Sequence, residues 1–467
     1  MMKFKKIITL ICMLALTMST AYAIQDKKAP DKKAPEEKTL YTNEVHSVFS
    51  LADCINVAIE NNPDIRAAIY NEQAYKSKIA QAWANYFPTI SAGVDVARSG
   101  SRYSHAKSLP YGYSSMYTTM GYVPNLSANM LIFDFGKTKA TADKAKNLYL
   151  ASKENTKENI NTVIYNIKSA YFNILFAQAQ IKVYEDTVKD YQLQLEQAWS
   201  FYKLGKKAKV DVVTADYNLG KAKLNLVKAK NILEVARSEL SMIMGLPEYT
   251  NYELSDDLIL NTFDITSEKA IKMAMDVRPE LISAEKSAKA AKMNLRAARR
   301  EFTPNLGISG SYSYGFGDKY NVSSAQIGAN LSYNALNILQ TAKQVSQARA
   351  EYEKSLAEFD STKNSVYFNV KKAYTDLETD RESIIIAKLA LDQATEQYRQ
   401  VTGRYKAGVG DAIELKDGEN TYLNARLDFY NAILNYNLSF ANLEKEIGVP
   451  IQFADALIIE LPSQEAK

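Results

Sequence analysis

The chain has 467 residues and a formal net charge of +4, and Lys3, Lys5 and Lys6 account for most of that charge. A nearly neutral remainder gives no electrostatic basis for nucleic-acid binding. Only two histidines, His46 and His105, are present, which excludes a histidine-rich metal site. After the N-terminal segment no apolar stretch reaches the ~18 residues of a membrane helix, so any membrane crossing has to use strands.

The N-terminus predicts a cleaved signal peptide over 1–23. A basic start precedes an apolar run, and Ala21-Tyr22-Ala23 has the A-x-A pattern of a cleavage site. Residues 24–49, which contain DKKAP twice, are too polar to bury a core and are expected to be a flexible leader. Cys54 is the only cysteine after this segment, so we expect no intrachain disulfide and a core position for Cys54.

The rest of the chain contains one pattern twice. The matching positions are Pro63 with Pro279, Pro88 with Pro304, Gly205 with Gly408, and Gly245 with Gly448. The proline pairs lie 216 residues apart and the glycine pairs 203, so 13 extra residues are expected in a longer loop near Arg98 to Gly121. The predicted organisation is a first repeat over 50–247, an equatorial linker over 248–265, a second repeat over 266–450 and a C-terminal tail over 451–467.

Each repeat is predicted to contain one long helix. Apolar residues follow alternating steps of four and three from Val163 to Tyr202, and again from Val366 to Tyr405, with only Asp380 breaking the second stripe. This spacing is typical of a coiled-coil seam. No proline occurs between residues 137 and 203 or between 340 and 405, so at ~1.5 Å per residue each helix is expected to be roughly 100 Å long.

Two shorter helices accompany each long helix. Their predicted ranges are about 51–86 and 211–244 in the first repeat, and about 268–301 and 414–447 in the second. Placed end to end, two short helices match one long helix in length. Gly205 and Gly408 follow the long helices, where a glycine can adopt the left-handed conformation that ends a helix in a tight turn.

A β-hairpin is predicted in each repeat, over about 88–135 and about 304–338. Apolar residues alternate there with small or polar ones, as in Ile90, Ala92, Val94 and Val96. Such strands suit a transmembrane barrel. Four strands are too few, because about eight are needed to close a barrel, so the chain is predicted to oligomerise.

Several short motifs occur in the same paired order as in a known family. They are YFPTIS and EFTPNL before the strands, FDFGKT at Phe133–Thr138, two K-x-G turns and two G-[LV]-P helix ends. Over Leu51 to about Pro450 the chain resembles the TolC family of outer-membrane channel proteins. The resemblance implies a mainly α fold with a transmembrane β part, in which a long coiled-coil helical barrel continues into a β-barrel shared by three protomers. It also implies a homotrimer in outer-membrane lipid with a large periplasmic part, a periplasmic adaptor, and an inner-membrane pump or secretion ATPase.

The resemblance also implies an acidic ring at the pore aperture. Glu414 and Asp417 match that ring and lie three residues apart, on one face of a helix. Carboxylates at a narrow aperture attract cations. The alternative interpretation is that these are ordinary acids at a helix start, where the helix dipole favours negative charge.

Two further positions match contacts that link the helical hairpins in the closed state of family members. They are Asp211 and Tyr405, which flank the bottom-turn glycines Gly205 and Gly408. The alternative interpretation is an ordinary helix cap for Asp211 and an ordinary seam position for Tyr405. The family often has an arginine where this chain has Gly410, so one closing contact is expected to be missing.

The function predicted from these features is passive exit for the substrates of a tripartite efflux pump. An exit duct of a type I protein-secretion system is a related alternative, and a non-pore periplasmic coiled-coil scaffold is an alternative of a different class. The alternating strands argue against the scaffold, which has no need of them. Because the sequence offers no nucleophile–base pair and no metal-ligand spacing, we expect no enzyme activity, no metal and no cofactor.

Overall fold

The computed structural model describes residues 47–104, 114–247, 252–255, 265–316, 321–333 and 337–448. The predicted signal peptide and C-terminal tail, and most of the predicted leader and linker, lie outside these residues. The chain divides into two units. The strands β1 (Ser47–Phe49) and β4 (Tyr252–Leu254) pair with each other, so the last three residues of the predicted leader are strand.

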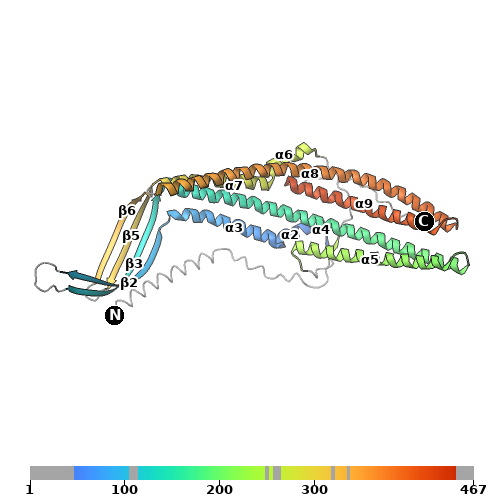
Figure 1. The fold of residues 1–467 in the computed structure, drawn as a ribbon, viewed down its shortest axis with the longest axis horizontal. Helices are drawn as coiled ribbons and strands as arrows, with labels where there is room; N and C mark the ends of the chain where they lie inside the picture. Colours follow the sequence, from blue (N-terminus) through green and yellow to red (C-terminus); the bar gives the residue numbers. More distant parts are fainter. Residues whose placement is uncertain are drawn as a thin grey trace. The chain divides into compact units, whose positions relative to one another are not determined.

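The larger unit repeats one order of elements twice (Figure 1). The first repeat contains α2 (Leu51–Asn61), α3 (Pro63–Trp83), η1 (Ala84–Tyr86), β2 (Thr89–Ser104), β3 (Ser114–Phe133), α4 (Lys137–Lys203) and α5 (Lys209–Met244). The second contains α6 (Ser267–Val277), α7 (Pro279–Arg299), η2 (Arg300–Phe302), β5 (Asn305–Phe316), β6 (Asn321–Ser332), α8 (Ile338–Lys406) and α9 (Ala412–Ile447). The predicted mainly helical fold with four strands is confirmed.

The first helix of each repeat is broken at its proline. The sequence predicted single helices over about 51–86 and 268–301, and this was wrong. The residue before each proline is extended, with ψ 125° at Asn62 and ψ 123° at Arg278. A proline ring clashes with a helical residue before it, so α2 and α6 end there and α3 and α7 begin at the prolines.

The long helices confirm the coiled-coil prediction. α4 has 67 residues and α8 has 69. Every seam position from Val163 to Tyr405 in the two predicted stripes is buried or half-buried, except Tyr202, which is exposed. Asp380 is tolerated in the second stripe because its carboxylate accepts a 2.5 Å hydrogen bond from the Ser439 hydroxyl on α9. No helix in the described ranges is both long enough and apolar enough to cross a membrane.

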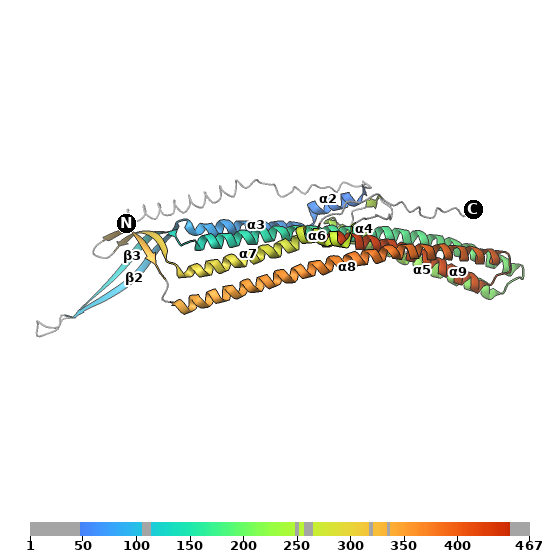
Figure 2. The ribbon, with the colours of Figure 1, turned by 90° about the horizontal axis from the view of Figure 1, so that it is seen from above.

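The short helices pack along the long ones (Figure 2). α3 and α5 pack against α4, while α7 and α9 pack against α8 and also against α4. The largest fully buried side chains of α4 therefore lie in the middle of the helix, at Ile167, Tyr171 and Ile174. Cys54 is fully buried on α2, which confirms its predicted core position.

The four strands of the larger unit form one antiparallel sheet in the order β2-β3-β5-β6. Strands β2 and β3 have 16 and 20 residues, whereas β5 and β6 have 12 each. The longer loop predicted near Arg98 to Gly121 was wrong for residues 98–104 and 114–121, which belong to β2 and β3, while residues 105–113 lie outside the described ranges. Among the strands that the structure describes, β2 and β6 each have one neighbour, so both edges of this sheet are open there.

The FDFGKT motif turns β3 into α4. Asp134 is buried, and its carboxylate accepts hydrogen bonds from the backbone N–H of Gly136 (3.0 Å) and Thr138 (2.6 Å) and from the Tyr86 hydroxyl (2.7 Å). Phe135 and Gly136 have positive φ values of 53° and 88°. The aspartate thus caps the long helix and ties it to the end of η1. The corresponding exit of the second repeat includes residues 334–336, outside the described ranges.

Candidate functional site

The turns that end the two long helices have the same backbone geometry. Gly205 and Gly408 have φ values of 68° and 76°, in the left-handed region that favours glycine. In the first turn the N–H of Lys206 donates to the Phe201 carbonyl at 2.9 Å. The equivalent bond in the second turn runs from Val409 to Arg404 at 3.1 Å. Both turns therefore satisfy the last helical carbonyls in the same way.

The second turn contains one additional tight position. A Cβ atom at Gly410 would lie 2.8 Å from the Tyr405 backbone nitrogen and 3.0 Å from the Arg404 carbonyl carbon. The Gly410 N–H donates to the Arg404 carbonyl at 3.0 Å. A side chain does not fit there without a shift of the backbone. The absence of an arginine at this position thus has a local steric reason.

The two acids predicted for the aperture lie on the first turns of α9 in different surroundings. Glu414 is half-buried, and its carboxylate accepts a 2.7 Å hydrogen bond from the Arg404 guanidinium at the end of α8. Asp417 is exposed. The ion pair between Arg404 and Glu414 was not predicted. It bridges the turn within one repeat and is largely accessible to solvent.

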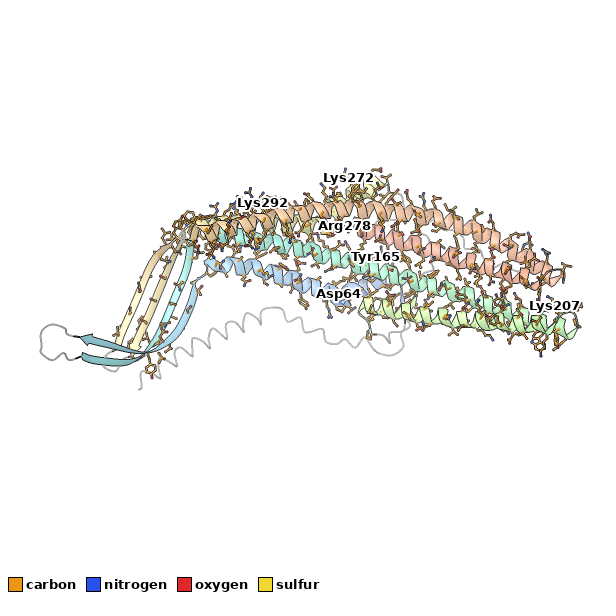
Figure 3. The ribbon with its side chains drawn as sticks, in the orientation of Figure 1. Asp64, Tyr165, Lys207, Lys272, Arg278 and Lys292 are labelled. Carbon is orange, nitrogen blue, oxygen red and sulfur yellow. The ribbon has the colours of Figure 1, made fainter. Side chains whose placement is uncertain are left out.

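The predicted linking residues lie on opposite sides of a contact between the repeats. Tyr405 is buried with Val401 and Leu415, and the Lys207 ammonium lies 4.2 Å from the centre of its ring. Figure 3 shows Lys207 at the turn between α4 and α5. The Asp211 carboxylate accepts a hydrogen bond from the Ala208 N–H at 3.2 Å, and no hydrogen bond joins it to Tyr405 among the described residues. The contact between the turns is therefore cation–π, through Lys207.

A group of polar side chains, the lower cluster, occupies the contact between α4 and α9. Its members are Asp186, Asp190, Tyr191 and Gln194 of α4, Tyr398 of α8, and Glu419, Tyr422 and Arg426 of α9. Glu419 is only 4% exposed, and both of its carboxylate oxygens accept hydrogen bonds of 3.2 Å from the Gln194 amide. At the edge of the cluster the Arg426 guanidinium donates to the Asp186 carboxylate at 3.2 Å.

The pKa of Glu419 is raised to about 7, mainly by burial and also by the nearby Asp190 carboxylate, while hydrogen bonds from Gln194 and Tyr191 lower it. Burial also raises the pKa of Asp190, with a smaller contribution from Asp186. The pKa of Tyr191 is raised by burial and by Glu419. A buried carboxyl that titrates near neutrality thus connects the two repeats.

Sequence reasoning missed the lower cluster, although a signal was present. The inward face of α9 repeats every seven residues at Leu415, Tyr422 and Phe429, and Ile433 follows four residues later. Within each seven, a second inward position is expected four residues after the first. Glu419 occupies one of those positions, where an apolar residue is expected. A charged residue in a seam requires a polar partner, and the partner comes from the other repeat.

A second contact between distant segments occurs where each returning helix ends. In the first repeat Asn62, 4% exposed, accepts hydrogen bonds from the N–H groups of Asp64 and Ile65 and donates to the Ile243 carbonyl at 2.8 Å. Gly245 ends α5 with φ 71°, and a Cβ there would lie 2.7 Å from the Asn61 carbonyl oxygen. The first junction is therefore neutral and tightly packed.

The equivalent junction of the second repeat is ionic. Arg278, also 4% exposed, donates from Nη1 to the Glu446 carbonyl (3.0 Å) and carboxylate (2.5 Å), while Nη2 lies 3.0 Å from the Glu280 carboxylate. Gly448 has φ 88°, and a Cβ there would lie 3.0 Å from Pro279 Cδ. In both repeats the residue before the proline holds the end of the returning helix.

In the described ranges no group of three His, Cys, Asp or Glu side chains is placed so that it could hold a metal ion. The polar groups at the turns and in the lower cluster bind each other. Their arrangement can stabilise or weaken the contacts between the helices of the two repeats.

A family model, individual relatives and a solved structure all relate this chain to the same group of proteins. The family described as "Outer membrane efflux protein" matches residues 54–246 and 270–449. "Outer membrane protein TolC" of Escherichia coli is 24% identical over 413 residues, covering 83% of this chain and 80% of that protein. "Alkaline protease secretion protein AprF" of Pseudomonas aeruginosa is 22% identical over 417 residues, covering 85% and 84%. The crystal structure of the Campylobacter jejuni CmeC outer membrane channel has the same fold, with a TM-score of 0.74, 19% identity and 85% of each chain covered.

Proposed function

Because this chain belongs to the outer membrane efflux protein family, we propose that it forms a homotrimeric channel-tunnel through which substrates of a tripartite efflux pump leave the cell passively. In this proposal three four-stranded sheets complete one β-barrel in the outer membrane. The long helices form a periplasmic tunnel. A periplasmic adaptor connects the tunnel to an inner-membrane pump.

The family membership confirms the predicted resemblance and the outer-membrane location. The family consists of channel proteins, and we propose that this chain likewise has no enzyme activity and needs no cofactor. The scaffold alternative has no support from this family. What remains to be tested is the assembly and its cargo.

The observation that carries the proposed assembly is a second apolar face on α5. One face of this helix is buried against α4, at Val212, Leu219, Ala222, Ala229, Ala236 and Leu240. The opposite face, here called the α5 stripe, is 51–70% exposed and contains Val210, Val213, Tyr217, Leu224, Val227, Ile232, Val235 and Met242. A helix that is apolar on both faces is normally buried on both, so the stripe favours contact with another copy.

The open sheet supports the same proposal. Ile90, Val94 and Val96 of β2, and Ile327 and Leu331 of β6, are exposed. Unpaired backbone groups on edge strands cannot be satisfied by lipid. Pairing of β6 of one copy with β2 of the next satisfies both edges at once, and repetition of this pairing closes a ring.

For the aperture, we propose that Glu414 and Asp417 form the acidic ring that a permeating ion meets. Three copies bring six carboxylates to the pore, a charge pattern that attracts cations. Tyr405 and Asp211 are proposed to stabilise the closed state, and the packing of Lys207 on Tyr405 supports this role for the tyrosine. Gly205 and Gly408 supply the turns that carry these residues.

The secretion alternative also has a specific observation in its favour. AprF, a relative that matches most of this chain, is named as an alkaline protease secretion protein. The two functions share one kind of channel and differ in the machine that feeds it. Expression of this chain with an adaptor and pump, or with an adaptor and secretion ATPase, separates them by whether dye efflux or export of a protein substrate is restored.

Light scattering of the mature protein in detergent tests the assembly, and three copies are expected. Val227→Glu places a charge in the α5 stripe and should release monomers, whereas Lys223→Glu, on an exposed position outside the stripe, should leave the trimer intact. A monomeric wild-type protein, or equal behaviour of the two variants, contradicts the proposed interface.

A further inference from the structure

The lower cluster places a buried carboxyl at a contact that must change if the two repeats separate. Glu419 belongs to α9, and its hydrogen-bond partner Gln194 belongs to α4, 225 residues away in the sequence. The Gln194 amide donates to both carboxylate oxygens at 3.2 Å, and the Tyr191 hydroxyl on the same helix also hydrogen-bonds the carboxylate. This is limited compensation for a charge that is almost completely withdrawn from water.

The packing around Glu419 indicates which helix contact of α9, with α8 or with α4, can separate. A Cβ atom at Gly418 would lie 2.7 Å from Val401 Cγ2, so α9 is pressed against α8 at this level. The adjacent residue Glu419 meets α4 through its hydrogen bonds with Gln194. The α8–α9 pair is therefore expected to move as one body, with the α4–α9 contact as the place where separation begins.

The charges that face Glu419 come from three helices. Asp190 and Tyr191 on α4 and Tyr398 on α8 interact with Glu419 itself. Asp186 on α4, Lys406 on α8 and Arg426 on α9 interact with Asp190. The Arg426 guanidinium is engaged with Asp186 and with the Tyr422 ring, 5.5 Å from its centre. The charge that acts on Glu419 is the Asp190 carboxylate, which repels an ionised Glu419.

We propose that Glu419 is a proton-operated latch between the repeats: when protonated it holds α9 against α4, and when ionised it weakens that contact and favours separation of the lower helices. The inference rests on the proposed channel function, to which it adds a means of control. Acidic conditions close the tunnel and neutral conditions release it.

The direction follows from the two protonation equilibria. In the separated state the carboxyl is hydrated and titrates near its ordinary value of 4.5, whereas in the packed state its pKa is about 7. Between these two pH values the packed state binds one proton more than the separated state, so protonation stabilises the packed state. This stabilisation is complete below pH 4.5 and is lost as the pH rises through 7. Each unit of difference is worth a factor of ten in the equilibrium.

The test is a pH series of single-channel recordings on the full mature protein in planar bilayers. We expect the equilibrium constant for opening to rise roughly 60-fold per carboxyl from pH 5 to pH 7.5. Glu419→Gln should stay closed and lose the pH response. Asp190→Asn should move the midpoint to lower pH, because a repelling charge is removed. Glu234→Gln, an exposed change on α5, should behave like the wild type.

A wild-type pH profile in Glu419→Gln, or an unchanged midpoint in Asp190→Asn, overturns the latch. Circular dichroism establishes whether Glu419→Gln folds, and if it does not, Asp190→Asn decides alone. Amide hydrogen exchange of residues 412–426, corrected for intrinsic rates, should be slower at pH 5 than at pH 7.5 in the wild type. Hydrogen exchange tests the latch independently of conductance. If no conductance is found, that result contradicts the proposed channel function and not the latch.

Discussion

Glycines end the returning helices at the junctions and also form the turns of the long helices, but they have different steric room at the two places. Gly245 and Gly448 leave no room for a Cβ atom, whereas Gly205 and Gly408 have nothing within 4 Å of that position. In Figure 3, Arg278 lies partway along the helices and Lys207 at the turn. The junctions bury their polar groups, and the turns expose theirs.

This difference separates a fixed region from an adaptable one. A buried, close-packed junction has one low-energy arrangement, because any displacement leaves polar groups without partners. An exposed turn held by one surface ion pair and one cation–π contact can rearrange at little cost. We infer that the junctions set how the helices are joined and that the turns are free to change during opening.

Removal of an arginine should therefore have its largest effect at the junction. Arg278→Met leaves the half-buried Glu446 carboxylate without its cation, and we expect a loss of about 4 kcal/mol in the free energy of unfolding. Arg404→Met breaks the exposed pair with Glu414 and should cost only about 0.5 kcal/mol. Urea titrations followed by circular dichroism at fixed protein concentration measure both.

A double variant sharpens this prediction. Arg278→Met combined with Glu446→Met removes both charges of the pair and should recover most of the lost stability. If the double variant is as unstable as Arg278→Met alone, the arginine acts through its packing or through the Glu446 carbonyl, and the ionic interpretation of this junction is wrong.

We expect glycine substitutions to show the same contrast between junction and turn, with smaller losses of unfolding free energy. Gly245→Ala combines an unfavourable φ with a contact 2.7 Å from a backbone oxygen, and should cost about 3 kcal/mol of unfolding free energy. Gly205→Ala meets only the unfavourable φ and should cost about 1 kcal/mol. Equal costs in the same urea titration mean that the junction can relax, against the proposed fixed role.

At the turns, replacement of the linking tyrosine should change gating more than stability. Tyr405→Leu keeps an apolar side chain against Val401 and Leu415 but loses the contact with Lys207, worth about 0.5–1 kcal/mol. We expect more frequent opening in bilayer recordings, with unchanged ion selectivity. Asp211→Asn should act in the same direction if the aspartate also stabilises the closed state. An unchanged open probability in both variants places the closing contacts elsewhere.

The smallest stability effect is expected for the proposed acidic ring. The double variant Glu414→Ala/Asp417→Ala should change the unfolding free energy by less than about 1 kcal/mol, because Asp417 is exposed and the half-buried Glu414 takes part only in a solvent-accessible ion pair. Its cation selectivity, measured by reversal potentials in a salt gradient, should fall. Wild-type selectivity in this variant means that the two acids are ordinary helix-start residues.

The sequence by itself determined the features that depend on neighbouring residues. Alternating steps of four and three predicted α4 and α8, because a seam is a property of one helix repeated along its length. Glycine positions predicted the left-handed turns at Gly205 and Gly408. The same local reasoning could have found the helix breaks, since Pro63 and Pro279 restrict the residues before them.

The tertiary structure decided which distant residues meet. Arg278 and Glu446 are 168 residues apart and Gln194 and Glu419 are 225 apart, and no local pattern pairs them. The order of the strands, the packing of Lys207 on Tyr405 and the surroundings of Glu419 likewise follow from how the two repeats pack. A carboxyl acquires an unusual pKa only when its neighbours are in place, because burial and nearby charge are properties of the folded chain.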